Sequence, residues 1–191
     1  MNFWQFWQLI ENDDWMPDDD PEWSGDYNPS YDDDDVGFTG DDEGLTNRGF
    51  WGNAGAGVLA IAADTGKILV QLRSGSVEEP YTYGVVGGAV KASDVSGFER
   101  AASEEFEEET GARLQKLIPA FRFQSGHFVY QNFIGIVPSE FQPRMNWEAD
   151  GYEWVTWEEL LRLHPKHFGL EALIKNSADL IKRYARGKRE N

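Results

Sequence analysis

Five glutamates occupy six consecutive positions of the chain, and the spacing of three of them suits metal-ion chemistry. The segment reads EEFEEETG from residue 104, and Glu105, Glu108 and Glu109 stand at positions i, i+3 and i+4. On a helix these side chains share one face, where each exposed pair repels by roughly 0.2–0.5 kcal/mol. A solvated acidic face is the ordinary explanation of such a run. A divalent cation would also offset the repulsion, because Mg²⁺ binds carboxylate, carbonyl and water oxygens.

The residues before the acidic segment favour the cation. A short apolar run, YTYGVV, leads as a strand into Gly87 and Gly88. A double glycine permits a tight backbone turn whose carbonyl groups can face a ligand. Residues 98–110 are predicted to form the helix that carries the glutamates, and Gly111 is predicted to end it. A divalent cation that prefers oxygen ligands therefore fits this arrangement of carboxylates and backbone carbonyl groups.

Apolar runs and turn residues predict the elements that hold this helix. Residues 55–63 and 67–73 are apolar runs joined by Asp-Thr-Gly, which indicates a β-hairpin. Three more strands are expected at residues 117–124, 127–137 and 151–157, and two more helices at 157–163 and 169–186. On the acidic helix, Ala102 and Phe106 are expected to pack against the sheet. Strands with helices between and after them favour an α/β fold, a mixed sheet covered on both faces.

The acidic segment resembles a Nudix box. The family pattern runs Gly, five residues, Glu, seven residues, Arg-Glu, an apolar residue, one residue, Glu-Glu, one residue, Gly and an apolar residue. The residues that match its second half are Glu105, Phe106, Glu108, Glu109, Gly111 and Ala112. The surrounding chain, over roughly residues 50–175, also resembles the family, and its later part is similar to a branch common among bacteriophage and bacterial members. The resemblance implies a Nudix-type α/β/α sandwich.

The same resemblance implies an activity and a set of residues for it. Family members hydrolyse the pyrophosphate bond of a nucleoside diphosphate linked to another group, such as ADP-ribose, a dinucleoside polyphosphate or a nucleoside triphosphate. The implied cofactor is Mg²⁺ or Mn²⁺, which neutralises the diphosphate and activates water. The implied catalytic residues are Glu105, Glu108 and Glu109, with Glu105 acting as a metal ligand or as the general base. The implied metal ligands are these glutamates with Gly87 and Glu148, and the implied substrate-binding residues are Arg73 and Gly88.

Several of these residues have a second interpretation. Glu148 would otherwise be a solvated loop acid. Arg73, which ends a predicted strand, would contact phosphate or form a salt bridge to the acidic site. Tyr81 could stack on a base, but core packing is the favoured prediction for it.

The chain departs from the family pattern at three points. Glu104 stands where the family has Arg, Ser96 stands where it has its first Glu, and the distance from Gly88 to the helix is two residues longer. In the family that Arg helps to orient the next Glu. These departures affect the expected catalytic rate more than metal binding. The alternative function is therefore a weakly active or inactive Nudix-fold protein that binds nucleotides or a protein partner, with the N-terminal segment as a docking tether.

Residues 1–49 differ in composition from the Nudix-like domain expected at residues 50–191. They hold fifteen acidic residues and one basic residue, whereas the domain holds nineteen acidic and sixteen basic residues, out of a net charge of −17. We expect an acidic extension with a short Trp-rich helix and then poorly ordered chain, which docks on the domain or on a partner protein.

The composition also bounds the environment and partners of the protein. The nearly neutral domain argues against nucleic-acid binding, which needs a basic surface. No stretch approaches the ~20 apolar residues of a membrane span. The absence of cysteine and of a secretory signal favours the cytoplasm, and a homodimer remains open.

Overall fold

The computed structural model describes residues 54–90, 97–125, 128–144 and 146–187. The predicted N-terminal helix, the acidic extension and Ser96 lie outside the described residues. Seven strands are described: β1 Ala54–Ala62, β2 Ile68–Arg73, β3 Tyr83–Gly84, β4 Val86–Ala89, β5 Lys116–Ser125, β6 Phe128–Val137 and β7 Ala149–Val155. The described helices are α2 Phe98–Thr110, α3 Trp157–Arg162 and α4 Phe168–Tyr184.

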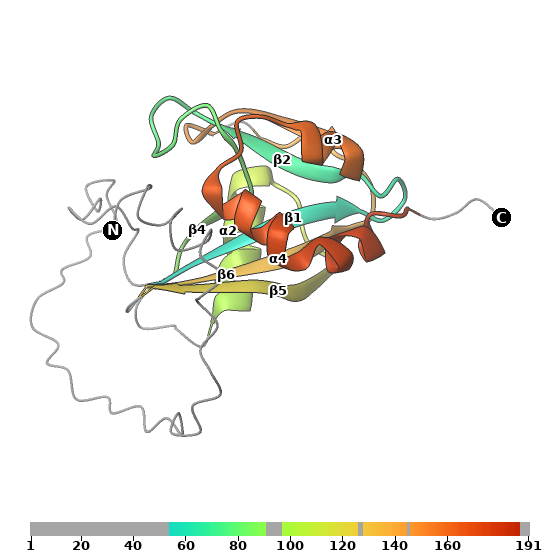
Figure 1. The fold of residues 1–191 in the computed structure, drawn as a ribbon, viewed down its shortest axis with the longest axis horizontal. Helices are drawn as coiled ribbons and strands as arrows, with labels where there is room; N and C mark the ends of the chain where they lie inside the picture. The colour runs from blue at the N-terminus through green and yellow to red at the C-terminus, as the bar shows by residue number, and fades with distance from the viewer. Residues whose placement is uncertain (1–53, 91–96, 126–127, 145, 188–191) are drawn as a thin grey trace, which may run out of the picture. The chain divides into compact units, whose positions relative to one another are not determined.

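Strand β1 is the centre of a single mixed sheet (Figure 1). On one edge it pairs in parallel with β6 along its whole length, from Ala54↔Val129 to Ala62↔Val137. On the other edge its first half pairs antiparallel with β4 and its end pairs antiparallel with β2. Strand β5 extends the sheet beyond β6, and β3 and β7 both pair with β2. The predicted hairpin is confirmed, and the mixed sheet follows from the parallel β1–β6 pair.

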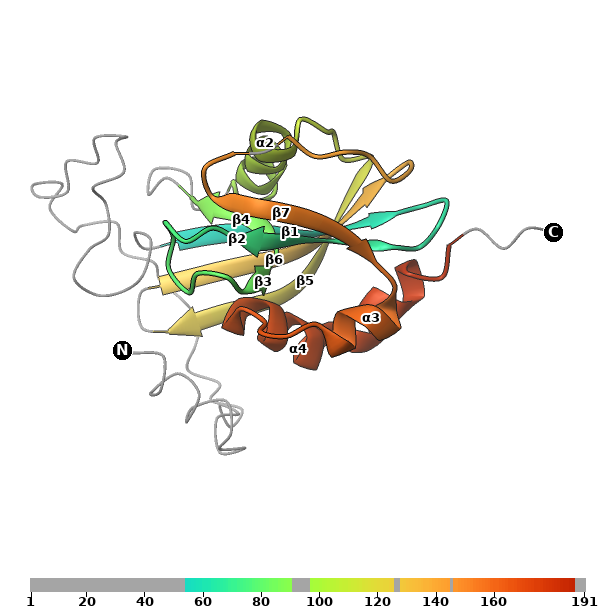
Figure 2. The ribbon, with the colours of Figure 1, turned by 90° about the horizontal axis from the view of Figure 1, so that it is seen from above.

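Helices cover both faces of this sheet, as Figure 2 shows with α2 on one side and α3 and α4 on the other. The alternation of side chains along β1 explains the two layers, because successive residues of a strand point to opposite faces. Val58 belongs to the cluster packed with Phe106 of α2, whereas Leu59 belongs to the cluster packed with Leu170 of α4. The central strand is therefore buried on both sides, which is why its sequence is almost continuously apolar. The expected α/β class is confirmed.

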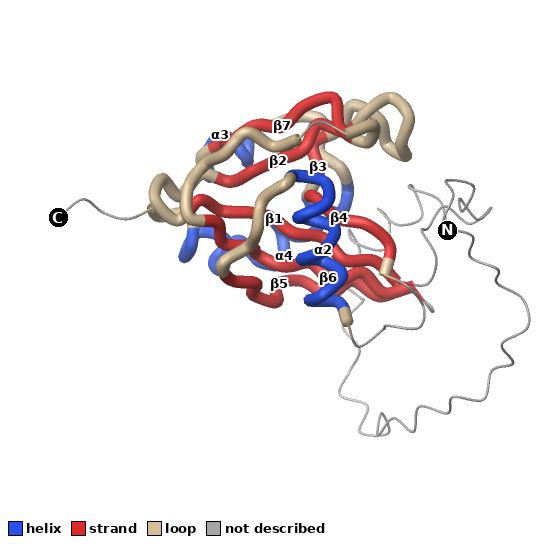
Figure 3. The backbone as a smooth tube through the Cα atoms, turned by 180° about the vertical axis from the view of Figure 1, so that it is seen from behind, coloured by secondary structure: helices blue, strands red, loops and turns tan. Residues whose placement is uncertain are grey.

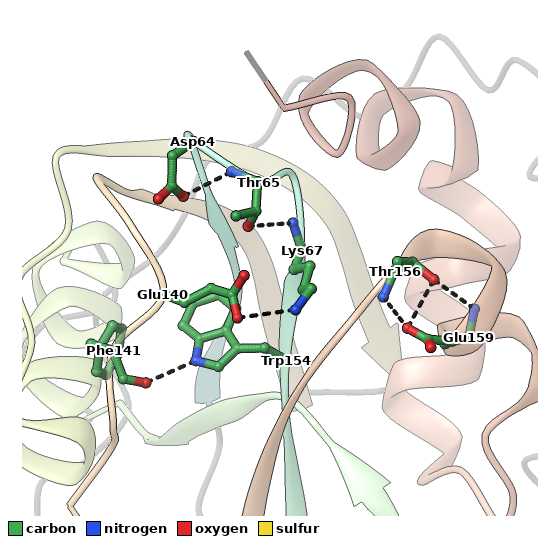
Figure 4. Close-up of polar contacts among 8 residues, drawn as sticks. All are labelled: Asp64, Thr65, Lys67, Glu140, Phe141, Trp154, Thr156 and Glu159. Atoms are coloured by element: carbon green, nitrogen blue, oxygen red, sulfur yellow. Dashed lines mark hydrogen bonds and ion pairs between the residues drawn. The ribbon is translucent and has the colours of Figure 1, made fainter. Parts of the chain in front are cut away.

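Local hydrogen bonds fix the ends of the elements (Figure 4). Thr156 begins α3 with a capping box, in which its side chain accepts from the Glu159 amide at 3.2 Å and the Glu159 carboxylate accepts from the Thr156 amide at 2.8 Å. Trp154 of β7 donates its indole N–H to the Phe141 carbonyl at 2.8 Å. This bond ties β7 to the segment that follows β6.

Three predictions made from the sequence need correction. Gly87 and Gly88, expected in a tight turn after a strand, lie inside strand β4 and pair with Gly57 and Ala56 of β1. The strand predicted over residues 81–86 is divided into β3 and β4, with Val85 between them. Tyr81 does not pack in the core, because 61% of its surface is exposed. No helix in the described part of the chain is long and apolar enough to cross a membrane.

Candidate active site

Helix α2 lies across β1 and β4 (Figure 3). The glutamates of this helix are buried to different extents. Phe106 is fully buried and marks the centre of the face that packs on the sheet. At 3.6 residues per turn, Glu109 lies about 60° around the helix from Phe106. Glu105 lies about 100° from it and Glu108 about 160°. Accordingly, Glu109 is buried, Glu105 is half-buried and Glu108 is exposed.

Glu105 lies directly against the glycine pair in β4. If Gly88 carried a Cβ atom, that atom would lie 3.0 Å from Glu105 Oε2 and 3.4 Å from Oε1. A Cβ on Gly87 would collide with the backbone of β1, so neither position accepts a side chain without displacement. The predicted carboxylate and the predicted glycines are therefore neighbours, and the missing side chain at Gly88 leaves room for both carboxylate oxygens.

Glu109 is the buried acid of the site. Burial raises the pKa of its carboxyl to about 8, and the nearby charges of Glu148 and Glu105 act in the same direction. Arg73 and a hydrogen bond with the side chain of Asn146 oppose the rise. Among the described residues nothing pairs with Glu109 Oε2, although that oxygen is shielded from solvent. A buried, unpaired oxygen beside two other carboxylates is costly unless a cation or a proton compensates it.

Glu148 is half-buried in the turn that precedes β7, which distinguishes it from a solvated loop acid. Its amide donates to the Asn146 side chain at 3.1 Å, and its carbonyl accepts from the Ser74 amide at 2.8 Å. The first bond shapes the turn, and the second ties the turn to the end of β2. Since Asn146 also bonds Glu109, the turn and the acidic helix are joined at this point.

Arg73 ends β2 at the start of the loop that leads to β3. Its Nε and Nη2 donate to the Glu78 carbonyl at 2.9 and 2.7 Å, so the guanidinium holds the loop. Burial lowers the pKa of Arg73, while Tyr130 and the surrounding glutamates act in the opposite direction. Its charge lowers the pKa of Glu109, which places the guanidinium near the acidic site.

Tyr130 of β6 lies next to the acidic cluster. Its ring occupies the space where Gly55 and Gly57 of β1 lack side chains, since a Cβ on Gly55 would lie 2.6 Å from Tyr130 Cδ2. Burial raises the pKa of its phenol, and Glu109 adds to the effect, which places the hydroxyl close to the cluster. Burial likewise raises the pKa of Tyr152 on β7, with Glu109 and Glu148 contributing. Both phenols therefore stay neutral at physiological pH.

The donor set fits a hard divalent cation in part. No three acidic or histidine side chains of the described residues stand close enough to form a complete protein cage for a metal. Mg²⁺ does not need one, because it commonly takes one or two carboxylates and completes its shell with water and substrate phosphates. The unpaired oxygen of Glu109, with Glu105 and Glu148 beside it, is the kind of donor group that such an ion uses.

The structure thus brings together most of the residues proposed from the sequence. Glu105, Glu109 and Glu148 lie in one cluster with Gly87 and Gly88 alongside, while Glu108 faces solvent. Sequence reasoning missed Tyr130, Tyr152 and Asn146. For Tyr130 a signal did exist, because alternate glycines in a central strand leave a groove that a large neighbouring side chain must fill. Nothing local marks Asn146, whose role depends on a contact with a distant helix.

Comparison with known proteins agrees with the fold. The family profile described as NUDIX domain matches residues 53–176. A Nudix hydrolase from M. Smegmatis, RenU, superposes with a TM-score of 0.58 at 23% identity, covering 74% of this chain and 92% of that one. The NUDIX domain of Shewanella oneidensis NrtR, solved with ADP ribose, gives 0.55 at 13% identity and covers 67% and 87%. A C. elegans Ap4A hydrolase gives 0.50 at 16% identity and covers 68% and 98%.

A comparison with curated protein sequences finds no match. At the identities above, structural similarity shows a shared fold and leaves the substrate open. The family profile, however, spans most of the described chain and includes the acidic helix, the glycine pair and the turn before β7. The chain therefore belongs to the NUDIX domain family.

Proposed function

We propose that this protein is a divalent-metal-dependent hydrolase of the pyrophosphate bond in a nucleoside diphosphate linked to another group. The observation that carries the proposal is the buried, unpaired Glu109 Oε2 next to Glu105 and Glu148. The charges of Glu105 and Glu148 disfavour ionisation of Glu109, and a cation that also binds a diphosphate would stabilise the three ionised carboxylates. ADP ribose bound by the NrtR domain and the Ap4A hydrolase provide precedents for small nucleotides as ligands.

In this proposal one or two of the carboxylates of Glu105, Glu109 and Glu148 hold Mg²⁺ or Mn²⁺ with the carbonyl of Gly87, and water and substrate phosphates complete the shell. Once bound, the cation would neutralise the diphosphate and activate the attacking water. Glu105 is the proposed acceptor of the proton from that water, because it is half-buried and more open to substrate than Glu109. Glu108 is exposed on α2, so in this proposal it binds metal only if a second cation is present.

Arg73 and Gly88 are the proposed substrate-binding residues. The guanidinium uses Nε and Nη2 to hold the Glu78 carbonyl, and its Nη1 is the proposed donor to a phosphate oxygen. Gly88 allows close approach, since its position has no side chain in front of the Glu105 carboxylate.

One observation favours the alternative, a weakly active nucleotide-binding protein. Glu104, which stands in place of the family Arg, is 58% exposed and pairs with Arg100 at 3.6 Å on the outer side of α2. Position 104 therefore brings no positive charge to the acidic cluster. A slower reaction with intact nucleotide binding is the expected consequence of that change.

A panel of nucleotides with Mg²⁺ or Mn²⁺ separates the two functions. The proposal predicts release of a nucleoside monophosphate by the wild-type protein and a loss of about 100-fold or more in kcat/KM for Glu105→Gln. Glu99→Gln is the matched control, because Glu99 is an exposed acid in the first turn of the same helix. Wild-type turnover no greater than that of Glu105→Gln, with nucleotide binding still measurable, would favour the binding protein.

A further inference from the structure

Two exposed aromatic residues lie in segments that contain or bond residues of the candidate active site. In the described part of the chain three large apolar residues are exposed: Tyr81 at 61%, Trp147 at 53% and Leu161 at 48%. Leu161 belongs to α3, whose neighbouring Leu160 packs into the cluster on the far face of the sheet. The two aromatic residues, by contrast, are each joined through the backbone to residues of the candidate active site.

Trp147 is positioned by both of its neighbours in the sequence. Asn146 bonds the carboxyl of Glu109, and Glu148 is one of the charges that raise the pKa of that carboxyl. The Asn146 side chain accepts from the Glu148 amide at 3.1 Å, which closes a tight turn around Trp147. The indole therefore leaves the chain at the rim of the cluster, between two residues that are part of it.

Tyr81 is positioned by backbone hydrogen bonds to Arg73, the last residue of β2. Its amide donates to the Arg73 carbonyl at 3.0 Å, and the Arg73 amide donates to the Thr82 carbonyl at 2.9 Å. The backbone of Tyr81 has φ 61°, a conformation that residues other than glycine rarely adopt. Strain of this kind persists where the surroundings impose it and gathers at ligand sites. The Arg73 guanidinium holds the Glu78 carbonyl of the same loop.

The Tyr81 ring also lies against a glycine of the same loop. A Cβ on Gly75 would lie 2.5 Å from the Tyr81 hydroxyl, so the phenol lies over the glycine backbone and leaves most of the side chain in solvent. A ring held in this way loses little conformational freedom when a ligand stacks on it. For Trp147, the Asn146–Glu148 hydrogen bond fixes the backbone turn from which the indole leaves the chain.

We propose that Tyr81 and Trp147 are the stacking surfaces for the planar base of the substrate, at the edge of the acidic cluster. This inference rests on the proposed function and specifies it: the substrate carries an aromatic base, and its diphosphate lies at Arg73 and the cluster while its base lies on these rings. Charge compensation and stacking are thereby divided between two parts of one site. Inorganic pyrophosphate and base-free diphosphates would use only the first part.

Titration calorimetry in Mg²⁺ tests this division directly, because it measures binding without turnover. The ligands are inorganic pyrophosphate and whichever of ADP, GDP and UDP binds wild-type protein most tightly. Tyr81→Ala and Trp147→Ala are each expected to raise the Kd of the nucleotide by about 5- to 150-fold, the range for loss of one base–aromatic stack, and to leave pyrophosphate unchanged. Tyr81→Phe and Trp147→Phe keep a ring and should retain nucleotide binding.

Leu161→Ala is the matched control, since it removes an exposed apolar side chain from α3 and should alter neither Kd. Equal weakening of nucleotide and pyrophosphate would show that the rings only support the loop, and would overturn the proposal. So would wild-type protein that binds no nucleotide more tightly than pyrophosphate. If instead nucleotide binding falls as expected but no substrate is hydrolysed, the proposed function fails while the stacking site stands.

Discussion

Replacing Glu109 with glutamine should remove a strong pH dependence from the stability of the metal-free protein. Burial and the charges of Glu148 and Glu105 raise the pKa of this carboxyl from 4.5 to about 8 in the folded chain. Between those two values the folded state keeps the proton and the unfolded state has released it. The free energy of unfolding therefore falls as pH rises, by about 1.36 kcal/mol per pH unit while both conditions hold.

The size of the effect follows from the same two pKa values. Integrated from about pH 5 to about pH 8, Glu109 removes about 3 to 4 kcal/mol of stability from the wild-type protein. The glutamine side chain in Glu109→Gln has no charge to bury, so the variant should lack this part of the slope and be the more stable protein at about pH 8. Added Mg²⁺ should stabilise the wild-type protein at that pH, because it would compensate the ionised carboxylate.

Urea denaturation followed by circular dichroism in a chelating buffer, at several pH values from about 5 to 8, measures this difference. Glu107→Gln is the control on the same helix: Glu107 is partly exposed and pairs with Arg113 at 2.7 Å on the surface, so its loss should change stability by less than ~1 kcal/mol and leave the slope intact. Parallel stability–pH curves for wild type and Glu109→Gln would refute the reasoning, because the buried acid would then not titrate between these values.

Two further predictions concern the glycine pair of β4 and the start of α3. Gly88→Ala should have a free energy of unfolding within ~1 kcal/mol of wild type but bind Mg²⁺ about 10- to 100-fold more weakly in calorimetry, because its Cβ meets the movable Glu105 carboxylate. Gly87→Ala should instead lower the free energy of unfolding in urea by about 1–3 kcal/mol or more, because its Cβ meets the backbone of β1. Thr156→Ala should lower the free energy of unfolding by about 0.5–2 kcal/mol through loss of the α3 capping box, and unchanged stability would show that the box contributes nothing.

The sequence predicted best where a local signal decides the structure. Helix α2 has the bounds expected for residues 98–110, because apolar residues spaced three and four apart meet a glycine that adopts φ 76° after the last turn. The β1–β2 hairpin was likewise specified by its Asp-Thr-Gly turn. Both depend on interactions between residues only a few positions apart.

The arrangement of the site could be predicted only in part. Glu105, Glu108 and Glu109 do lie on one side of α2, but the sequence reasoning did not use the position of Phe106, from which burial falls from Glu109 through Glu105 to the exposed Glu108. Asn146 and Tyr130 reach the cluster through pairings between strands and turns far apart in the sequence, and composition carries no record of such pairings. Tyr81 was expected in the core because aromatic residues usually lie there, whereas a strained loop holds it in solvent.

The Tyr130 ring and the three glycines beneath it have a consequence for how this chain can vary. A methyl group at Gly55 or Gly57 would occupy the volume of the ring, and one at Gly87 would crowd its hydroxyl as well as the neighbouring backbone. An alanine at either position in β1 is compatible only with a smaller residue at 130, and a smaller residue there would leave the acids without the ring that lies next to them. Gly55, Gly57, Gly87 and Tyr130 should therefore be conserved or replaced together. A related chain that differs at these positions is expected to have an altered acidic cluster.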